Sequence, residues 1–178
     1  MKRAVLSLCL LAFAAPAFAE APGDTAGPIT NQAARDATTA RVRAGAPCPR
    51  CDLFQADLSY QNLARRDFAG ARLRQSDLEL ATADRTNFRG ANLSIANFFG
   101  ARLADADLTE VNLSRANLVG AYLGGARLHG AVLTDANLAG AELADALGLT
   151  QAQLDHACGD AATTLPAGLH VQTCHRAQ

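Results

Sequence analysis

The chain has 178 residues and a formal net charge of -1 at pH 7; 49% of its residues are hydrophobic, but only 5% are aromatic. The 16 basic and 17 acidic residues leave no basic excess for binding nucleic acid, and a charged fraction of 19% is too low for a disordered chain. The scarcity of large aromatic side chains favours a repetitive architecture over an ordinary globular core.

Residues 1–19 have the pattern of a secretory signal peptide. Lys2 and Arg3 precede an uncharged, mainly apolar run, and small residues end at Ala19. Pro16 interrupts this run, which is shorter than the roughly 20 apolar residues of a membrane-spanning helix. The sequence therefore predicts cleavage after Ala19, a periplasmic or secreted bacterial protein, and no membrane span in the mature chain.

Residues 20–47 are rich in Ala, Gly, Pro and Thr, and we expect a leader followed by an N-terminal cap. Within this segment, Asn31 to Arg43 is expected to form a short helix. Cys48 and Cys51 follow in a C-x-x-C pattern, which in some proteins exchanges disulfides. A thioredoxin-like βαβ context is absent, so a structural clip is favoured over a redox or metal-binding role.

A large apolar residue recurs at every fifth position from Leu53 to Leu143, in nineteen consecutive repeats with Ala83 as the one small centre. On an α-helix these side chains would spiral around the axis, and on a flat strand they would alternate between faces. All of them can be buried together only if the chain turns once per repeat. The period therefore predicts a polygonal tube with Leu and Phe inside.

The other repeat positions agree with this tube. Ala predominates two residues before the centre, where a narrow interior needs a small side chain. Asn or Asp is favoured immediately before the centre, which suits a turn and a stacked ladder of side chains. Several of these residues recur at twenty-residue spacing, which fits four repeats per coil, although a ten-residue spacing would fit almost as well.

The units Ala91-Asn92-Leu93-Ser94 and Ala106-Asp107-Leu108-Thr109 resemble the A(D/N)LXX motif of pentapeptide repeat proteins. The resemblance covers residues 52–145. It implies an all-β fold, a right-handed quadrilateral β-helix with four repeats per coil, closed by short α-helical or irregular end caps. We place this solenoid at residues 48–145.

Three residues depart from the repeat pattern. Ala83 replaces a large centre, and underpacking is expected there unless Phe88 or Phe98 fills the space. Gln61 and Arg66 occupy inward positions that are normally small, and Arg66 is expected to reach water at the N-terminal end of the tube.

Residues 146–178 are predicted to form a C-terminal cap. Thr150 and Gln153 have capping-box spacing, which predicts a helix running to about Ala157. The segment from Leu149 onward resembles the Cys-containing tail of exported bacterial pentapeptide repeat proteins. Cys158 and Cys174 lie beyond the tube, about 20 Å from the other cysteine pair, so we expect disulfides Cys48–Cys51 and Cys158–Cys174.

Catalytic residues and cofactors are not expected. No nucleophile with a base, paired carboxylate site or phosphate loop is discernible, so the chain is predicted not to be an enzyme. A metal cluster would draw on residues of the C-terminal cap, but their spacing matches no standard zinc pattern and an oxidising compartment favours the disulfide; these residues are His156, Cys158, His170, Cys174 and His175.

A candidate interaction patch lies on the outer surface. With twenty residues per coil, its members share one side of the tube or stand at the edge of that side; they are Tyr60, Leu80, Ile95, Phe99 and Val119. Aligned exposed apolar side chains suggest an unknown protein partner, a homodimer contact or a docking site for the leader. The sequence leaves these three alternatives open.

The sequence thus predicts a non-enzymatic exported scaffold or protein-interaction module. The alternative suggested by the resemblance is a DNA mimic that protects a type II topoisomerase through an acidic surface. Export would separate the protein from that enzyme, and arginines interrupt any acidic strip, among them Arg65, Arg72, Arg85, Arg89, Arg102, Arg115 and Arg127. A thiol-redox or metal-binding protein using Cys48 and Cys51 is the other alternative.

Overall fold

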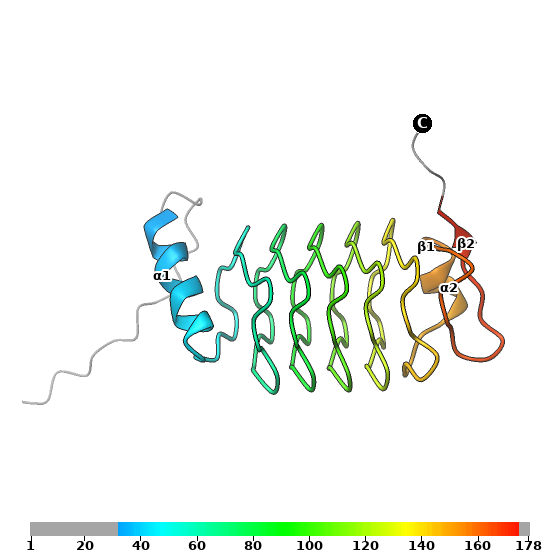
Figure 1. Cartoon of the computed structure of the whole chain (residues 1–178), viewed down its shortest axis with the longest axis horizontal. Coiled ribbons are helices and arrows are strands. Elements are labelled where there is room, and N and C mark those ends of the chain that lie inside the picture. Colours follow the sequence, from blue (N-terminus) through cyan, green and yellow to red (C-terminus); the bar gives the residue numbers. More distant parts are fainter. Residues whose placement is uncertain (1–31, 175–178) are drawn as a thin grey trace, which may run out of the picture. The chain divides into compact units, whose positions relative to one another are not determined.

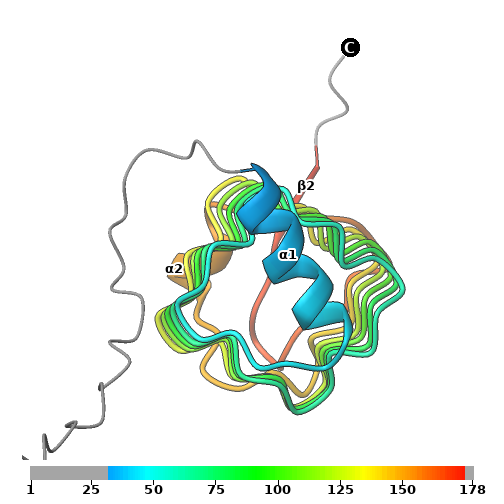
Figure 2. The same ribbon diagram turned by 90° about the vertical axis from the view of Figure 1, so that its left-hand side faces the viewer.

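The structure, a computed structural model, describes residues 32–174. Its named elements are α1 (Gln32–Arg43), α2 (Gln151–Leu154), β1 (Cys158–Gly159) and β2 (Gln172–Thr173). Between α1 and α2 the chain winds in stacked coils (Figure 1), which enclose a tube with four sides (Figure 2). The expected signal peptide and most of the expected leader lie outside the described residues. Within 32–174, no helix is both long and apolar enough to cross a membrane.

Parallel β-bridges connect each coil to the next at a spacing of twenty residues, from Asp52 with Arg72 to Arg127 with Leu147. Twenty residues are four repeats, so the structure selects four repeats per coil over a ten-residue coil. Each bridge involves one residue per coil because the chain turns every five residues. Of the residues described, only β1 and β2, which pair in parallel at the C-terminal end, form longer strands.

A tight turn ends each repeat, and one repeat illustrates its geometry. The amide of Ala96 donates to the carbonyl of Leu93 at 3.1 Å, and the side-chain oxygen of Asn92 accepts from the amide of Ser94 at 3.1 Å. Ile95 occupies the left-handed backbone region with φ of 61°. The Asn or Asp before each centre is therefore explained by an Asx-turn hydrogen bond.

The interior is a column of Leu and Phe side chains lined by Ala, and the repeat centres are at most 2% exposed. The small centre Ala83 lies in the coil that also contains Phe88 and Phe98, whose rings meet edge to face with centroids 6.4 Å apart. Phe88 also stacks on Phe68 of the preceding coil at 5.4 Å. Two Phe side chains thus share the coil interior with Ala83, as expected from the sequence.

The N-terminal end of the tube is joined to α1, as the sequence predicts. Val42 is buried with the first coil, and the Arg43 guanidinium donates to the backbone carbonyl and the carboxylate of Asp57. The structure adds a contact that the sequence did not predict: the guanidinium of Arg66, which is half-buried, donates to the carbonyl of Val42. The carbonyls at a helix C-terminus lack intrahelical donors and carry partial negative charge, which attracts this cation.

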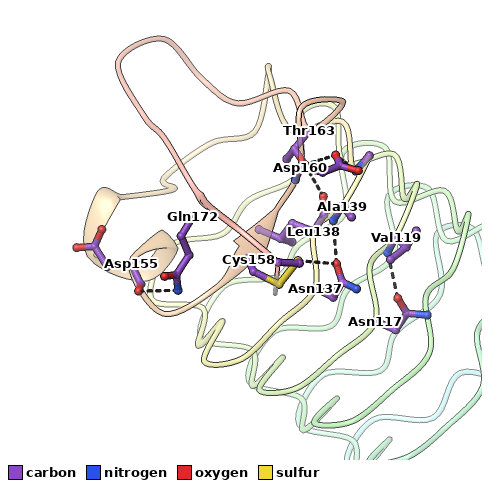
Figure 3. Close-up of a disulfide and its surroundings, with 12 residues drawn as sticks. Asn117, Val119, Asn137, Leu138, Ala139, Asp155, Cys158, Asp160, Thr163 and Gln172 are labelled. Atoms are coloured by element: carbon purple, nitrogen blue, oxygen red, sulfur yellow. Dashed lines mark hydrogen bonds between the residues drawn. A yellow bond between two sulfur atoms is a disulfide. The ribbon is translucent and has the colours of Figure 1, made fainter. Parts of the chain in front are cut away.

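The C-terminal end is covered by the segment after Leu147, which we call the lid (Figure 3). The lid pairs with the last coil through bridges of Asn137 with Cys158 and of Glu142 with Thr164. Asp160 accepts the Gly140 amide through its carboxylate at 2.8 Å. These contacts give backbone groups of the last coil the partners that a further coil would otherwise provide.

Helix α2 is shorter than predicted, because it ends at Leu154 instead of near Ala157. The capping position is correct: the amide of Thr150 donates to Oε1 of Gln153 at 2.9 Å. After Leu154 the chain returns to the end of the tube, where Ala157 is buried and Cys158 pairs with Asn137. Pairing with the last coil thus replaces further helix.

Candidate protein-interaction site

One side of the tube, which we call the Phe99 side, gathers most of the exposed apolar residues expected from the sequence. It is formed by residues 56–60, 76–80, 96–100, 116–120 and 136–140, which are stacked through the parallel bridges. None of these residues is Arg, Lys or His, whereas each of the other three sides carries arginines.

The structure places Tyr60 and Leu80 in one column of this side, and Phe99 and Val119 in the next. Tyr60 is 68% exposed, Leu80 46% and Phe99 45%, while Val119 is half-buried. The two columns are linked directly, since the Leu80 amide donates to the Phe99 carbonyl at 2.9 Å. Ile95 is also half-buried and stands at the corner that leads into this side.

A ladder of polar side chains holds the backbone of the Phe99 side. Nδ2 of Asn97 donates to Asp77 at 3.1 Å, and Nδ2 of Asn117 donates to Asn97 at 2.9 Å. The Oδ1 atoms of Asn97 and Asn117 also accept the backbone amides of Phe99 and Val119 at 3.2 and 3.3 Å. The ladder therefore fixes the backbone that presents the two apolar side chains.

Glycines leave room beside these apolar side chains. Gly100, Gly120 and Gly140 follow Leu80 in its column, and a Cβ atom on Gly100 would lie only 2.7 Å from Cδ2 of Leu80. The Leu80 side chain thus lies across Gly100, next to Phe99 in the chain. The result is an apolar surface spread over neighbouring coils.

The charge on this side is negative and lies toward its N-terminal end, on Asp57, Asp77 and Glu79. Hydrogen bonds from the hydroxyl and amide of Ser59, aided by the Arg43 guanidinium, hold the pKa of Asp57 below its ordinary value. Asp57 therefore stays ionised to a lower pH than an unpartnered aspartate.

Three exposed apolar residues were not predicted: Tyr122, Val132 and Leu147. Each stands immediately before a repeat centre or at the equivalent position, where Asn or Asp is usual. An apolar residue at this outward position was the sequence signal that could have identified them. They lie on the three other sides of the tube. Separate exposed apolar side chains of this kind are normal on protein surfaces, so they do not define a second patch.

The cysteines are joined as Cys48–Cys51 and Cys158–Cys174, with Cα atoms 5.4 and 4.7 Å apart. Cys48 is buried against the first coil. Sγ of Cys174 lies 3.2 Å from Oδ1 of Asn137, so the second disulfide stands at the end of the Phe99 side. Disulfide exchange requires access to sulfur, and the burial of Cys48 opposes it.

Metal-binding residues do not converge in the part of the chain that the structure describes. Among residues 32–174 there is no group of three or more His, Cys, Asp or Glu side chains arranged to hold a metal ion. Cys158 and Cys174 are instead paired with each other. His175, which belongs to the alternative metal cluster, lies outside the described residues.

The bridged coils and the five-residue period define a solenoid that presents flat outer sides. The model of the pentapeptide repeats family matches this chain with 8 copies, at residues 51–90, 67–98, 76–115, 96–135 and 116–158. The matches span more than half of the chain, so the protein belongs to the pentapeptide repeat family.

Several solved structures similar to this chain are also pentapeptide repeat proteins. HetL, involved in heterocyst differentiation regulation in the cyanobacterium Nostoc, is 28% identical with a TM-score of 0.39; the match covers 64% of this chain and 50% of HetL. A protein of the Arabidopsis thaliana thylakoid lumen is 31% identical with a TM-score of 0.33, over 58% of this chain and 81% of its own.

A second Nostoc protein is 27% identical with a TM-score of 0.42, over 78% of this chain and 94% of its own. This chain thus spans about half the length of HetL but most of the other two proteins. No curated protein sequence matches it significantly.

Proposed function

We propose that this protein is a non-enzymatic, exported scaffold that binds a protein partner through the Phe99 side. The observation that carries the proposal is the concentration of Tyr60, Leu80, Phe99 and Val119 on the one side that has no arginine. Apolar surface that gathers on one face of a rigid element is typical of a protein-interaction site.

Tyr60 and Leu80 stand at the fifth position of the repeat, where the chain turns. Their φ of 59° and 52° lies in the left-handed region, as it does at the same position of other repeats such as Arg65 and Arg115. Gly100 and Gly120 occupy this position in later coils, where the same φ involves no Cβ penalty. The conformation is therefore a feature of the repeat, and the exposure of the Tyr60 and Leu80 side chains is what supports an interaction role.

We also infer that the tube is a right-handed quadrilateral β-helix. Membership in the pentapeptide repeat family and the twenty-residue bridge spacing support this inference. The coil-to-coil hydrogen bonds and the filled interior make such a tube rigid, so the partner would meet a preformed surface.

Export is supported by the two disulfides together with the signal-peptide pattern of residues 1–19. Disulfides persist in oxidising compartments such as the bacterial periplasm. Topoisomerase protection is the less favoured function, because the arginines on three sides interrupt a continuous acidic surface of the kind DNA presents.

The proposal is tested by capture from an extract of the organism's own periplasm. The immobilised wild-type protein is compared with Phe99→Asp, Leu80→Asp and the control Ser114→Asp, which adds the same charge on a different side of the tube. We expect one protein to be retained by the wild type and the control but lost by both Phe99-side variants. Retention of the same proteins by all four baits would contradict a partner site on this side.

Two further measurements test the other possible occupants of the Phe99 side, a second copy of the chain and the leader. Light scattering over a range of concentrations tests a homodimer: its mass should rise for wild type and Ser114→Asp but not for Phe99→Asp. Deletion of residues 20–31 tests leader docking, which requires changes in the amide NMR signals of Phe99 and Val119. A concentration-dependent mass would identify a second copy as the occupant in place of an external partner. Changes in the NMR signals would identify the leader.

A further inference from the structure

A second candidate site lies on the side of the tube that follows the Phe99 side along the chain. A hollow of about 520 Å³ opens there, within the range of small-molecule sites. It is lined by Asn62, Ala64, Arg65, Asp84, Arg85, Arg102, Ala104 and Asp105. Its shape follows from the sequence, because Ala64 and Ala104 are short while the arginines beside them are long.

Hydrogen bonds fix the positions of Asp84 and Arg102 in the hollow. Nε of Arg102 donates to both carboxylate oxygens of Asp84, at 2.8 and 3.1 Å, and the amide of Ala104 donates to Asp84 at 3.0 Å. The Arg102 guanidinium also lies over the Tyr122 ring, 5.7 Å from its centroid. Asp84 therefore has its charge balanced by Arg102, and the Arg102 side chain is held in place.

The remaining positive charge is poorly balanced. Arg65 and Arg85 occupy the same repeat position in successive coils, whose backbones are about 4.8 Å apart, so their like charges repel each other. Arg85 meets Asp105 only at 3.4 Å, and Arg65 has no ion pair among the described residues. The hollow contains three arginines and two aspartates, so it retains a net positive charge.

We propose that this hollow binds a hydroxyl-bearing organic oxyanion, such as an acidic sugar. A carboxylate or phosphate group placed between Arg65 and Arg85 would accept charge-assisted hydrogen bonds and relieve their repulsion. The carboxylates of Asp84 and Asp105 supply acceptors for sugar hydroxyls, and Nδ2 of Asn62 supplies a donor. This site is separate from the Phe99 side and does not depend on the function proposed for it.

The test is an NMR titration of the isotope-labelled protein with glucuronate, glucose 6-phosphate, glucose or acetate. We expect saturable shifts of the Ala64, Arg65 and Ala104 amides with millimolar glucuronate or glucose 6-phosphate, and much weaker binding of glucose and acetate. Whichever of the two acids binds more tightly identifies the anionic group. No saturable shifts with either acid, or equal binding of acetate, would overturn the proposal.

The variant Arg65→Gln, Arg85→Gln should weaken binding of the tighter acid by about tenfold or more. The control Arg115→Gln changes an arginine at the same repeat position and backbone conformation, with φ of 60°, on another side. Thermal unfolding should show that the double variant is folded, because it removes a repulsion and no strong ion pair. Equal loss of binding in the control would show that the hollow is not the site.

Discussion

Packing around Ala83 illustrates how one small residue permits larger ones elsewhere in the same coil. Phe88 and Phe98 meet within this coil, and Ala83 is fully buried beside them. A leucine, the usual centre, would compete with the two rings for the same space. We expect Ala83→Leu to lower the free energy of unfolding by about 1–3 kcal/mol, measured by urea denaturation.

The control for this prediction is a compensating change. In Ala83→Leu, Phe98→Leu the added volume is offset by the loss of a ring, so the double variant should be more stable than the sum of the single effects predicts. Strictly additive effects of Ala83→Leu and Phe98→Leu would contradict the shared-space explanation.

Asp57 provides a prediction on pH dependence. Its pKa is lowered in the folded protein, chiefly by hydrogen bonds from Ser59 and further by Arg43, so the carboxylate contributes stability above the unfolded pKa of about 4. That contribution is lost as the pH falls through the lower, folded pKa. Asp57→Asn and Ser59→Ala should both lose less stability than the wild type between neutral pH and about pH 3. Identical losses in all three, measured by urea denaturation, would contradict this assignment.

For single residues, the sequence predicts burial well. It predicts the hydrogen-bond partners of polar side chains less well. The period alone identifies the centres from Leu53 to Leu143, because no regular flat element can bury that spacing. It does not predict that Arg66 meets the Val42 carbonyl, since that contact depends on where α1 packs. Side-chain partners set by three-dimensional packing carry no periodic signal.

Among the elements, α2 closes the side of the tube at residues 131–135, where no β-bridge joins the last coil to the chain that follows. Nε2 of Gln153 donates to the carbonyls of Leu128 and Ala131, at 2.8 Å each, while its Oε1 accepts the Thr150 amide. A single side chain thus caps the helix and supplies donors to the end of the tube. The sequence predicts the first of these roles but not the second.

We expect Gln153→Glu to lower the free energy of unfolding by about 2–3 kcal/mol, because a carboxylate cannot donate to the Leu128 and Ala131 carbonyls and would repel them. Thermal or urea unfolding measures this loss. The control is Gln75→Glu, which makes the same change at an exposed position of a repeat and should alter stability by less than about 0.5 kcal/mol. Equal effects of the two changes would show that these hydrogen bonds do not stabilise the lid.

Helices and strands were predictable to different extents. The α1 segment and the α2 capping position follow from local sequence, whereas the end of α2 depends on pairing of Cys158 with Asn137, far away in the sequence. The candidate patch was predictable once twenty residues per coil was assumed, because columns then follow from arithmetic. Its isolation from arginine becomes evident only when the four sides are compared, and the hollow beside Arg65 depends on side-chain conformations.

On the scale of the whole described region, the four sides share one backbone plan but differ in surface chemistry. Uniform coils leave the outward positions free to vary without disturbing the Leu and Phe interior. The Phe99 side is apolar and acidic, and the next side carries the arginine-lined hollow. A solenoid can therefore present two separate binding surfaces on one rigid support.

Stability of the same solenoid should be graded from its ends, because each coil contacts mainly its neighbours. The Cys158–Cys174 disulfide closes a loop with a sequence separation of 16, and the lid accepts amides of the last coil, including Leu138 at 2.7 Å and Leu143 at 2.8 Å. We expect Cys158→Ala, Cys174→Ala to lower lid stability by about 3 kcal/mol. Hydrogen exchange should then accelerate at Leu138 and Leu143 but little at Leu103, which lies in a more central coil.

The matched control is Cys48→Ala, Cys51→Ala, which removes the disulfide at the other end. Its shorter loop predicts a smaller loss of stability, and faster exchange should be confined to the first coil, around Leu53. If this disulfide is only structural, the wild-type protein should also fail to accelerate reduction of a model disulfide substrate. Uniform acceleration of exchange in both variants would mean that the solenoid opens as one cooperative unit, and catalysed reduction would restore a redox role for Cys48 and Cys51.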